Sequence, residues 1–100
     1  MIQGSTPTHY FELPFDVSNI KTVHINYAQD KQIIVTKTER DCMFGGNVLE
    51  VTLTQEDTLA LDHSKPVEIQ IRVITFDGAS LVSVISKVGI AECLETEVLV

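Results

Sequence analysis

Apolar and polar residues alternate with a period of two in five separate segments of this chain, and a half-buried β-strand has the same period. The clearest run lies between positions 67 and 73, where every odd-numbered residue is apolar: Val67, Ile69, Ile71 and Val73. Successive side chains of a strand point to opposite faces, so each run places one face on a core and the other in water. The pattern therefore predicts an all-β chain.

Turn-forming residues separate these runs. Asp16–Asn19, Asp30–Lys31, Gly45–Asn47 and Asp77–Gly78 are the interruptions, and Asp, Asn and Gly favour turns because they tolerate turn conformations. About seven short strands spaced in this way predict a two-sheet antiparallel β-sandwich of the immunoglobulin-like kind, with a small barrel as the structural alternative. Residues 79–90 are apolar in both phases, which predicts either a bulge near Ser83 or a strand buried on both faces.

Positions 54–61 break the period of two. Thr54 can accept a hydrogen bond at a helix N-terminus, and Glu56 and Asp57 suit the positive end of a helix. We expect one helical turn from Thr54 to Leu59, capped by Thr54. The predicted core comprises Phe11, Leu13, Val23, Ile25, Ile33 or Ile34, Leu49, Val51, Leu59, Leu61, Ile69, Ile71 and Val73.

The length of 100 residues predicts a single domain over 1–100. Within it we expect a flexible N-terminus over 1–6, and a last strand or an acidic tail over 92–100. The net charge of −7 disfavours nucleic-acid and anionic-membrane partners. The N-terminus lacks a basic stretch followed by an apolar core, so we expect cytosolic synthesis without a signal peptide.

Motifs for catalysis or metal binding are weak. Cys42 and Cys93 are predicted to be free thiols, and no cysteine or histidine spacing indicates zinc. The run Asp62–His63–Ser64 resembles a catalytic triad only in composition, because consecutive side chains diverge. The acid pairs Glu56/Asp57 and Glu95/Glu97 are interpreted as capping or solvated groups, and His24 as a solvated histidine. We predict no enzyme activity, no catalytic residue, no metal and no cofactor.

The C-terminal run ends in three apolar residues after three acids, which is unusual for a solvated tail. Val98, Leu99 and Val100 are therefore predicted to be buried, either in a last strand of the chain's own sheet or by strand addition to a neighbouring subunit. Tyr10 is out of phase with Phe11 and is predicted to be exposed. These four residues form the predicted partner-binding set, and self-association is one predicted outcome.

Three stretches together resemble a protein family: Thr6–Asp16, Leu53–Leu59, and Gln70–Val73 leading into Asp77–Gly78. Their order and spacing resemble small proteins of about this length encoded among the virion structural genes of tailed phages and prophages of Gram-positive gut bacteria. The resemblance implies a virion-associated structural or accessory protein that assembles with other virion subunits, without catalytic residues. The sandwich pattern is also similar to the N-terminal immunoglobulin-like domain of phage baseplate upper proteins. The alternatives are a module that binds carbohydrate or a host surface, and a small hydrolase.

Overall fold

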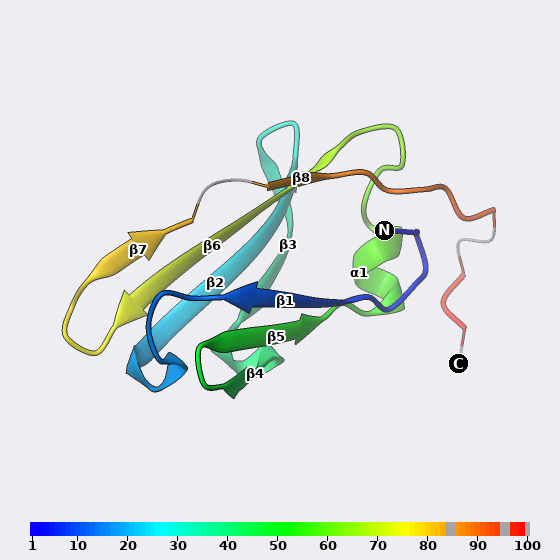
Figure 1. Cartoon of the computed structure of the whole chain (residues 1–100). Helices are drawn as coiled ribbons and strands as arrows, with labels where there is room; N and C mark the ends of the chain where they lie inside the picture. Colours follow the sequence, from blue (N-terminus) through cyan, green and yellow to red (C-terminus); the bar gives the residue numbers. More distant parts are fainter. Residues whose placement is uncertain (84–85, 95–96, 100) are drawn as a thin grey trace.

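The computed structural model describes residues 1–83, 86–94 and 97–99. Two antiparallel sheets face each other (Figure 1), one with strand order β1-β5-β4 and one with order β3-β2-β6-β7. The small sheet contains β1 (Thr8–Glu12), β4 (Cys42–Gly45) and β5 (Val48–Thr52). The large sheet contains β2 (Ile20–Gln29), β3 (Gln32–Thr38), β6 (Val67–Thr75), β7 (Ser80–Val82) and β8 (Ser86–Val88). The predicted two-sheet antiparallel sandwich is confirmed.

β7 and β8 share one edge of the large sheet. β2 occupies one side of β6, and both β7 and β8 pair with its other side. The described residues therefore fill seven strand positions, in agreement with the predicted number. The pairing of β8 with β6 is offset by one residue from that of β7, as expected for the irregularity predicted near Ser83.

The turns follow from residues that adopt positive φ. Asp30 and Lys31 have φ angles of 49° and 63°, which join β2 to β3 in a two-residue turn. Gly46 and Gly78 lie in the β4–β5 and β6–β7 hairpins with φ angles of 59° and 91°. Short 3-10 turns, η1 (Val17–Asn19) and η2 (Glu39–Asp41), carry the chain from one sheet to the other.

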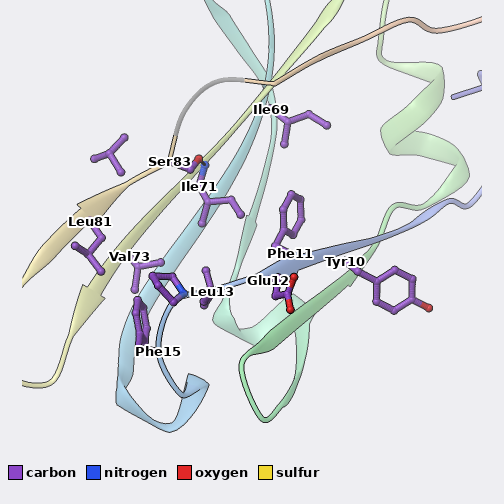
Figure 2. A pocket seen from close by; sticks show the side chains of 12 residues that line it. Tyr10, Phe11, Glu12, Leu13, Phe15, Ile69, Ile71, Val73, Leu81 and Ser83 are labelled. Atoms are coloured by element: carbon purple, nitrogen blue, oxygen red, sulfur yellow. Dashed lines mark hydrogen bonds between the residues drawn. The ribbon is translucent and has the colours of Figure 1, made fainter.

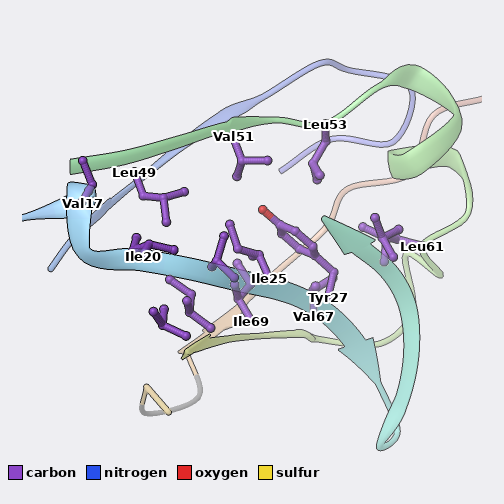
Figure 3. Packing of buried hydrophobic residues seen from close by; sticks show 14 of the residues in the cluster. Val17, Ile20, Ile25, Tyr27, Leu49, Val51, Leu53, Leu61, Val67 and Ile69 are labelled. Atoms are coloured by element: carbon purple, nitrogen blue, oxygen red, sulfur yellow. The ribbon is translucent and has the colours of Figure 1, made fainter. Parts of the chain in front are cut away.

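The core lies between the sheets (Figure 3), with side chains from both inner faces interdigitating. Most of the predicted core is confirmed by burial: Val23, Ile25, Leu49, Val51, Leu61, Ile69, Ile71 and Val73. Tyr27, Val35, Leu53 and Val67 are also buried. Phe11, Leu13 and Leu59 are only partly buried, so the prediction that they are core residues overstates their burial.

The core prediction for Ile33 or Ile34 is wrong, because their exposed fractions are 61% and 38%. The register between β2 and β3 shifts at Tyr27/Ala28, so Val35 pairs with Tyr27 and Ile33 pairs with Ala28. Val35 therefore takes the buried position opposite Tyr27. Ile33, Ile34 and Val35 are all apolar, so the alternation of apolar and polar residues does not show which of them faces the core. The pairing of β3 with β2 decides this.

The helical turn α1 (Gln55–Leu59) begins as predicted. The Thr54 hydroxyl accepts a hydrogen bond from the Asp57 amide at 3.1 Å, and the Asp57 carboxylate accepts one from the Thr54 amide at 2.8 Å. This reciprocal arrangement satisfies two amide groups that have no partner within the helix. Thr58 and Leu61 are buried behind it.

Replacing Thr54 with alanine should lower the free energy of unfolding by about 1 kcal/mol, because Asp57 loses its capping acceptor. Chemical denaturation measures this loss. Glu56→Ala is the matched control, since the Glu56 side chain is exposed in the same turn and makes no capping bond among the described residues; its backbone bond to Ala60 is kept in the variant. Equal losses in the two variants would contradict the role of the cap.

Residues 1–6 are anchored, which differs from the flexible N-terminus expected from the sequence. Ile2 forms a parallel bridge with Ala91, and the side chain of Gln3 is buried. The side-chain nitrogen of Gln3 donates a hydrogen bond to the Leu61 carbonyl at 2.6 Å, and its side-chain oxygen accepts one from the Cys93 backbone amide at 3.1 Å. One glutamine thus joins the N-terminus to two distant parts of the chain.

The sequence predicts either a last strand or an acidic tail over 92–100, and residues 92–94 and 97–99, the described part of this segment, form no strand. Glu95 and Val100 lie outside the described residues. No helix within the described ranges has the length and apolar character that crossing a membrane requires.

Candidate functional site

An apolar groove of about 500 Å³ opens between the small sheet and the edge of the large sheet. β1 and the residues after it supply Phe11, Leu13 and Phe15. β6 supplies Ile69, Ile71 and Val73, and β7 supplies Leu81. Figure 2 shows these side chains turned toward a shared space. We call this feature the β1–β7 groove.

The groove exists because the two sheets differ in width. The small sheet ends at β1, whereas the large sheet continues past β6 to β7. The inner face of β6 therefore lacks a complete cover on that side. Leu81 pairs with buried Val73, which places it on the same inner face, yet 41% of it is exposed. This mismatch also explains the partial burial of Phe11 and Leu13.

The outer edge of β1 borders the groove and has free backbone groups. Leu53 donates to the Pro7 carbonyl at 3.0 Å, and Leu13 donates to the Asn47 carbonyl at 2.8 Å, so odd-numbered residues of β1 bond to β5. Backbone groups alternate in direction along a strand, so those of Thr8, Tyr10 and Glu12 point away from β5. Across the described ranges, no strand pairs with this edge.

Tyr10, predicted to contact a partner, lies at the rim of the groove. Its exposed fraction is 66%, and its ring points away from the groove in Figure 2. It neighbours Glu50, which in turn pairs with the exposed Met43 of β4. Tyr10 therefore belongs to the outer face of the small sheet, while its backbone belongs to the free edge.

The predicted tail residues lie elsewhere. Val98 and Leu99 are exposed, and the Leu99 backbone exchanges two hydrogen bonds of 2.8 Å with the Gln55 side-chain amide of α1. Val100, the remaining predicted residue, is outside the described part of the chain. Within one chain, the structure places Tyr10 apart from Val98 and Leu99, the predicted tail residues that it describes.

Phe15 and Leu81 line the groove, although the sequence pattern does not indicate them as site residues. Leu81 lies in a stretch that is apolar in both phases, so alternation does not indicate its face. Phe11 and Leu13 were assigned to the core by the same alternation. To predict the groove, one would need the number of strands in each sheet. The total number of strands, which is all that the sequence pattern gives, does not say how they divide between the two sheets.

A polar cluster inside the sandwich is structural. The hydroxyl of Tyr27 lies 2.7 Å from Nδ1 of His9, and Tyr27 is fully buried. Burial, followed by nearby Cys42 and Asp57, raises the pKa of Tyr27, so the phenol keeps its proton and shares a hydrogen bond with His9. Lys37 and Asp57 form a 2.7 Å ion pair that joins β3 to α1. The first contact therefore connects the two sheets, and the second connects the large sheet to α1.

Lowering the pH should destabilise the protein through His9. Burial, followed by the nearby N-terminal amine, lowers the pKa of His9 from its ordinary value of 6.5. The folded state therefore binds fewer protons than the unfolded state. The stability contributed by neutral His9 is present above pH 6.5 and is lost as the pH falls through the lower folded pKa.

The measurement is urea unfolding of wild type and His9→Gln at a series of pH values. We expect the variant to lose less stability than wild type on acidification, since glutamine does not titrate. Parallel pH profiles for the two proteins would contradict this role of His9.

The other sequence candidates have structural roles. Asp62 accepts hydrogen bonds from the amide and hydroxyl of Ser64 at 2.8 and 2.6 Å, while His63 faces Glu92 at 3.8 Å. Asp62, His63 and Ser64 therefore form a local turn. His24 is exposed on the outer face of the large sheet. The described residues contain no cluster of three potential metal ligands.

Cys42 and Cys93 form no disulfide among the described residues, in agreement with the prediction of two reduced thiols. Burial raises the pKa of the Cys42 thiol to about 11, aided by Asp41 and Glu39. Since the thiolate is the reactive form, Cys42 is a poor nucleophile. Its Sγ donates a hydrogen bond to the Thr38 carbonyl at 3.3 Å.

The sequence matches no protein-family model and no curated protein. Among solved structures, the chain is similar to the V domain of amphioxus IgVJ-C2, at 20% sequence identity. The match covers 90% of this chain and 96% of that one, with a TM-score of 0.37.

Proposed function

We propose that this chain is a non-enzymatic structural or accessory protein of a phage or prophage virion, which assembles with other protein subunits through the β1–β7 groove. The observation that carries the proposal is an uncovered apolar groove beside a free strand edge. An added strand gains affinity from backbone hydrogen bonds to the edge, and its alternate side chains enter the groove.

The character of the groove supports a protein partner. Apart from Glu12, its lining contains no charged residue, and most of its residues are aliphatic or aromatic. The Ser83 hydroxyl accepts a hydrogen bond from the Ile71 amide at 2.9 Å, so it is already engaged. Small-molecule sites generally present several convergent polar groups that fix the ligand's orientation. A strand supplies that orientation through its backbone instead.

The non-enzymatic part of the proposal rests on the polar groups. Among the candidate polar groups, His9 contacts the other sheet, Asp57 belongs to the cap of α1, and Asp62 belongs to a turn. The virion context comes from the family resemblance. The carbohydrate-binding alternative has only the exposed ring of Tyr10 as its support, and a sugar platform usually needs more aromatic area.

The experiment is quantitative mass spectrometry of purified particles released from cells that encode the chain. Wild type is compared with Leu81→Asp, which places a charge in the groove. Ser80→Asp is the matched control, because Ser80 is exposed in the same strand and does not line the groove. We expect wild type and Ser80→Asp in particles at a constant ratio to the other subunits, and Leu81→Asp depleted at least about tenfold. Absence of wild type from particles, or equal incorporation of Leu81→Asp, would overturn the proposal.

A further inference from the structure

We propose that the occupant of the β1–β7 groove is the C-terminal segment of a second copy of this chain, residues 94–100, which pairs as an extra strand with the free edge of β1. This inference rests on the proposed function, since it names the partner that enters the groove. It makes the chain both a donor and an acceptor in its own assembly.

The groove suits a single extended segment better than the edge of a folded domain. β6 and β7 extend beyond β1 and form the floor beneath the position of an added strand. If a second copy offered its own β1 edge, its large sheet would have to occupy the same space as β6 and β7. A segment without a sheet behind it avoids this overlap.

The C-terminal segment has the pattern that the groove requires. Its even-numbered residues are Leu94, Thr96, Val98 and Val100, and its odd-numbered residues between them are Glu95, Glu97 and Leu99. Alternate side chains of a strand share a face, so the even-numbered set presents an almost entirely apolar face. Seven residues in a strand span about 23 Å at roughly 3.3 Å per residue, comparable with the eight residues from Thr8 to Phe15.

The described apolar residues of the tail are incompletely covered in the single chain, since even Val98, which borders a pocket that Leu53 also lines, is 40% exposed. Leu94 is 95% exposed and Leu99 is 64% exposed. The tail and the groove are therefore two uncovered apolar features of one chain. Figure 1 shows the tail leaving beside α1, while β7 lies at the opposite end of the sandwich. Gln55 of the same chain binds the Leu99 backbone on the α1 side, away from the groove, so the matching groove is that of another copy. Strand addition there exchanges the two Gln55 hydrogen bonds of Leu99 for backbone hydrogen bonds to β1.

Donor and acceptor are different surfaces, so the contact is head-to-tail. Such contacts form a ring when the rotation closes and a filament when it does not. In the added strand, Glu95 and Glu97 lie on the outer face together with Glu12 of the acceptor. Like charges on neighbouring strands repel, and salt screens the repulsion. Self-association should therefore strengthen as the salt concentration rises.

The test separates donor from acceptor. Leu94→Asp/Val98→Asp removes the apolar face of the donor and keeps the groove. Leu81→Asp removes the acceptor and keeps the tail. A second acceptor variant, Tyr10→Pro, removes one outward-pointing amide of β1, and Tyr10→Val is its control because valine keeps that amide. Leu99→Asp is the donor control, since residue 99 belongs to the outward set.

Size-exclusion chromatography with light scattering is the measurement. We expect wild type, Leu99→Asp and Tyr10→Val to form oligomers that grow with concentration and salt. The donor-deficient double variant, Leu81→Asp and Tyr10→Pro should each remain monomeric, with self-association at least about tenfold weaker. An equimolar mixture of the double variant with Leu81→Asp should yield dimers and nothing larger. Circular dichroism melts confirm that each variant is folded.

Monomeric wild type at all concentrations and salt levels would overturn the inference, as would a mixture that yields no dimer. Oligomers of the double variant that match wild type would overturn it too. These outcomes are distinguishable from failure of the proposed function. If wild type is monomeric but Leu81→Asp is still depleted from particles, the groove binds a different virion subunit.

Discussion

Replacing Ile25 with alanine is expected to lower the free energy of unfolding by about 2–5 kcal/mol, through lost burial and the cavity that remains. Ile25 is fully buried in β2, the strand that pairs with β3 on one side and β6 on the other. It belongs to the core cluster, to which both sheets contribute side chains, so its truncation leaves a cavity between the sheets. Urea denaturation monitored by circular dichroism measures the loss.

Ile71→Ala is the informative comparison. Ile71 pairs with Ile25 across β2 and β6 and fits the same alternation, but it lines the groove. Its removal enlarges a space that is already open, so the loss should fall at the low end of the same range of about 2–5 kcal/mol. A loss for Ile71→Ala equal to or larger than that for Ile25→Ala would show that the groove is closed in solution.

Replacing Gln29 with methionine is expected to cost about 1–3 kcal/mol, the penalty for leaving buried backbone groups without partners. The buried Gln29 amide donates to the Asp62 and Lys65 carbonyls at 2.7 and 3.2 Å, and accepts from the Asp62 amide at 2.8 Å. These bonds hold the connection between α1 and β6 against the end of β2. Methionine has a similar length and none of these bonds.

Gln55→Met is the matched control for Gln29→Met. Gln55 makes the same kind of two-way amide contact, with the Leu99 backbone, but its hydrogen bonds are exposed. Water replaces exposed bonds at little cost, so the control should unfold nearly as wild type does. Both variants are compared at a protein concentration low enough to keep the chain monomeric. Equal losses would mean that burial of the Gln29 bonds contributes nothing.

The candidate site was predictable only in pieces. The exposure of Tyr10 follows from its phase relative to Phe11, and the unusual apolar end of the chain is visible in the sequence. The roles of Val98, Leu99 and Val100 in binding stay predictions. The groove itself combines Leu13, Ile71 and Leu81, which lie far apart in the sequence. Alternation assigns the first two to an inner face but does not reveal whether anything covers that face.

Local chemistry determined much of this protein. The period-two runs determined its strands, the positive-φ positions its hairpins, and Thr54 with Asp57 the start of α1. Each of these depends on neighbours within a few residues, so the sequence alone is sufficient. Tertiary structure decided which of Ile33, Ile34 and Val35 is buried, because the pairing of β3 with β2 selects the phase. It also decided the widths of the two sheets. That difference in width leaves β1 with a free edge above an uncovered part of β6, because a three-stranded sheet cannot cover the inner face of a wider one.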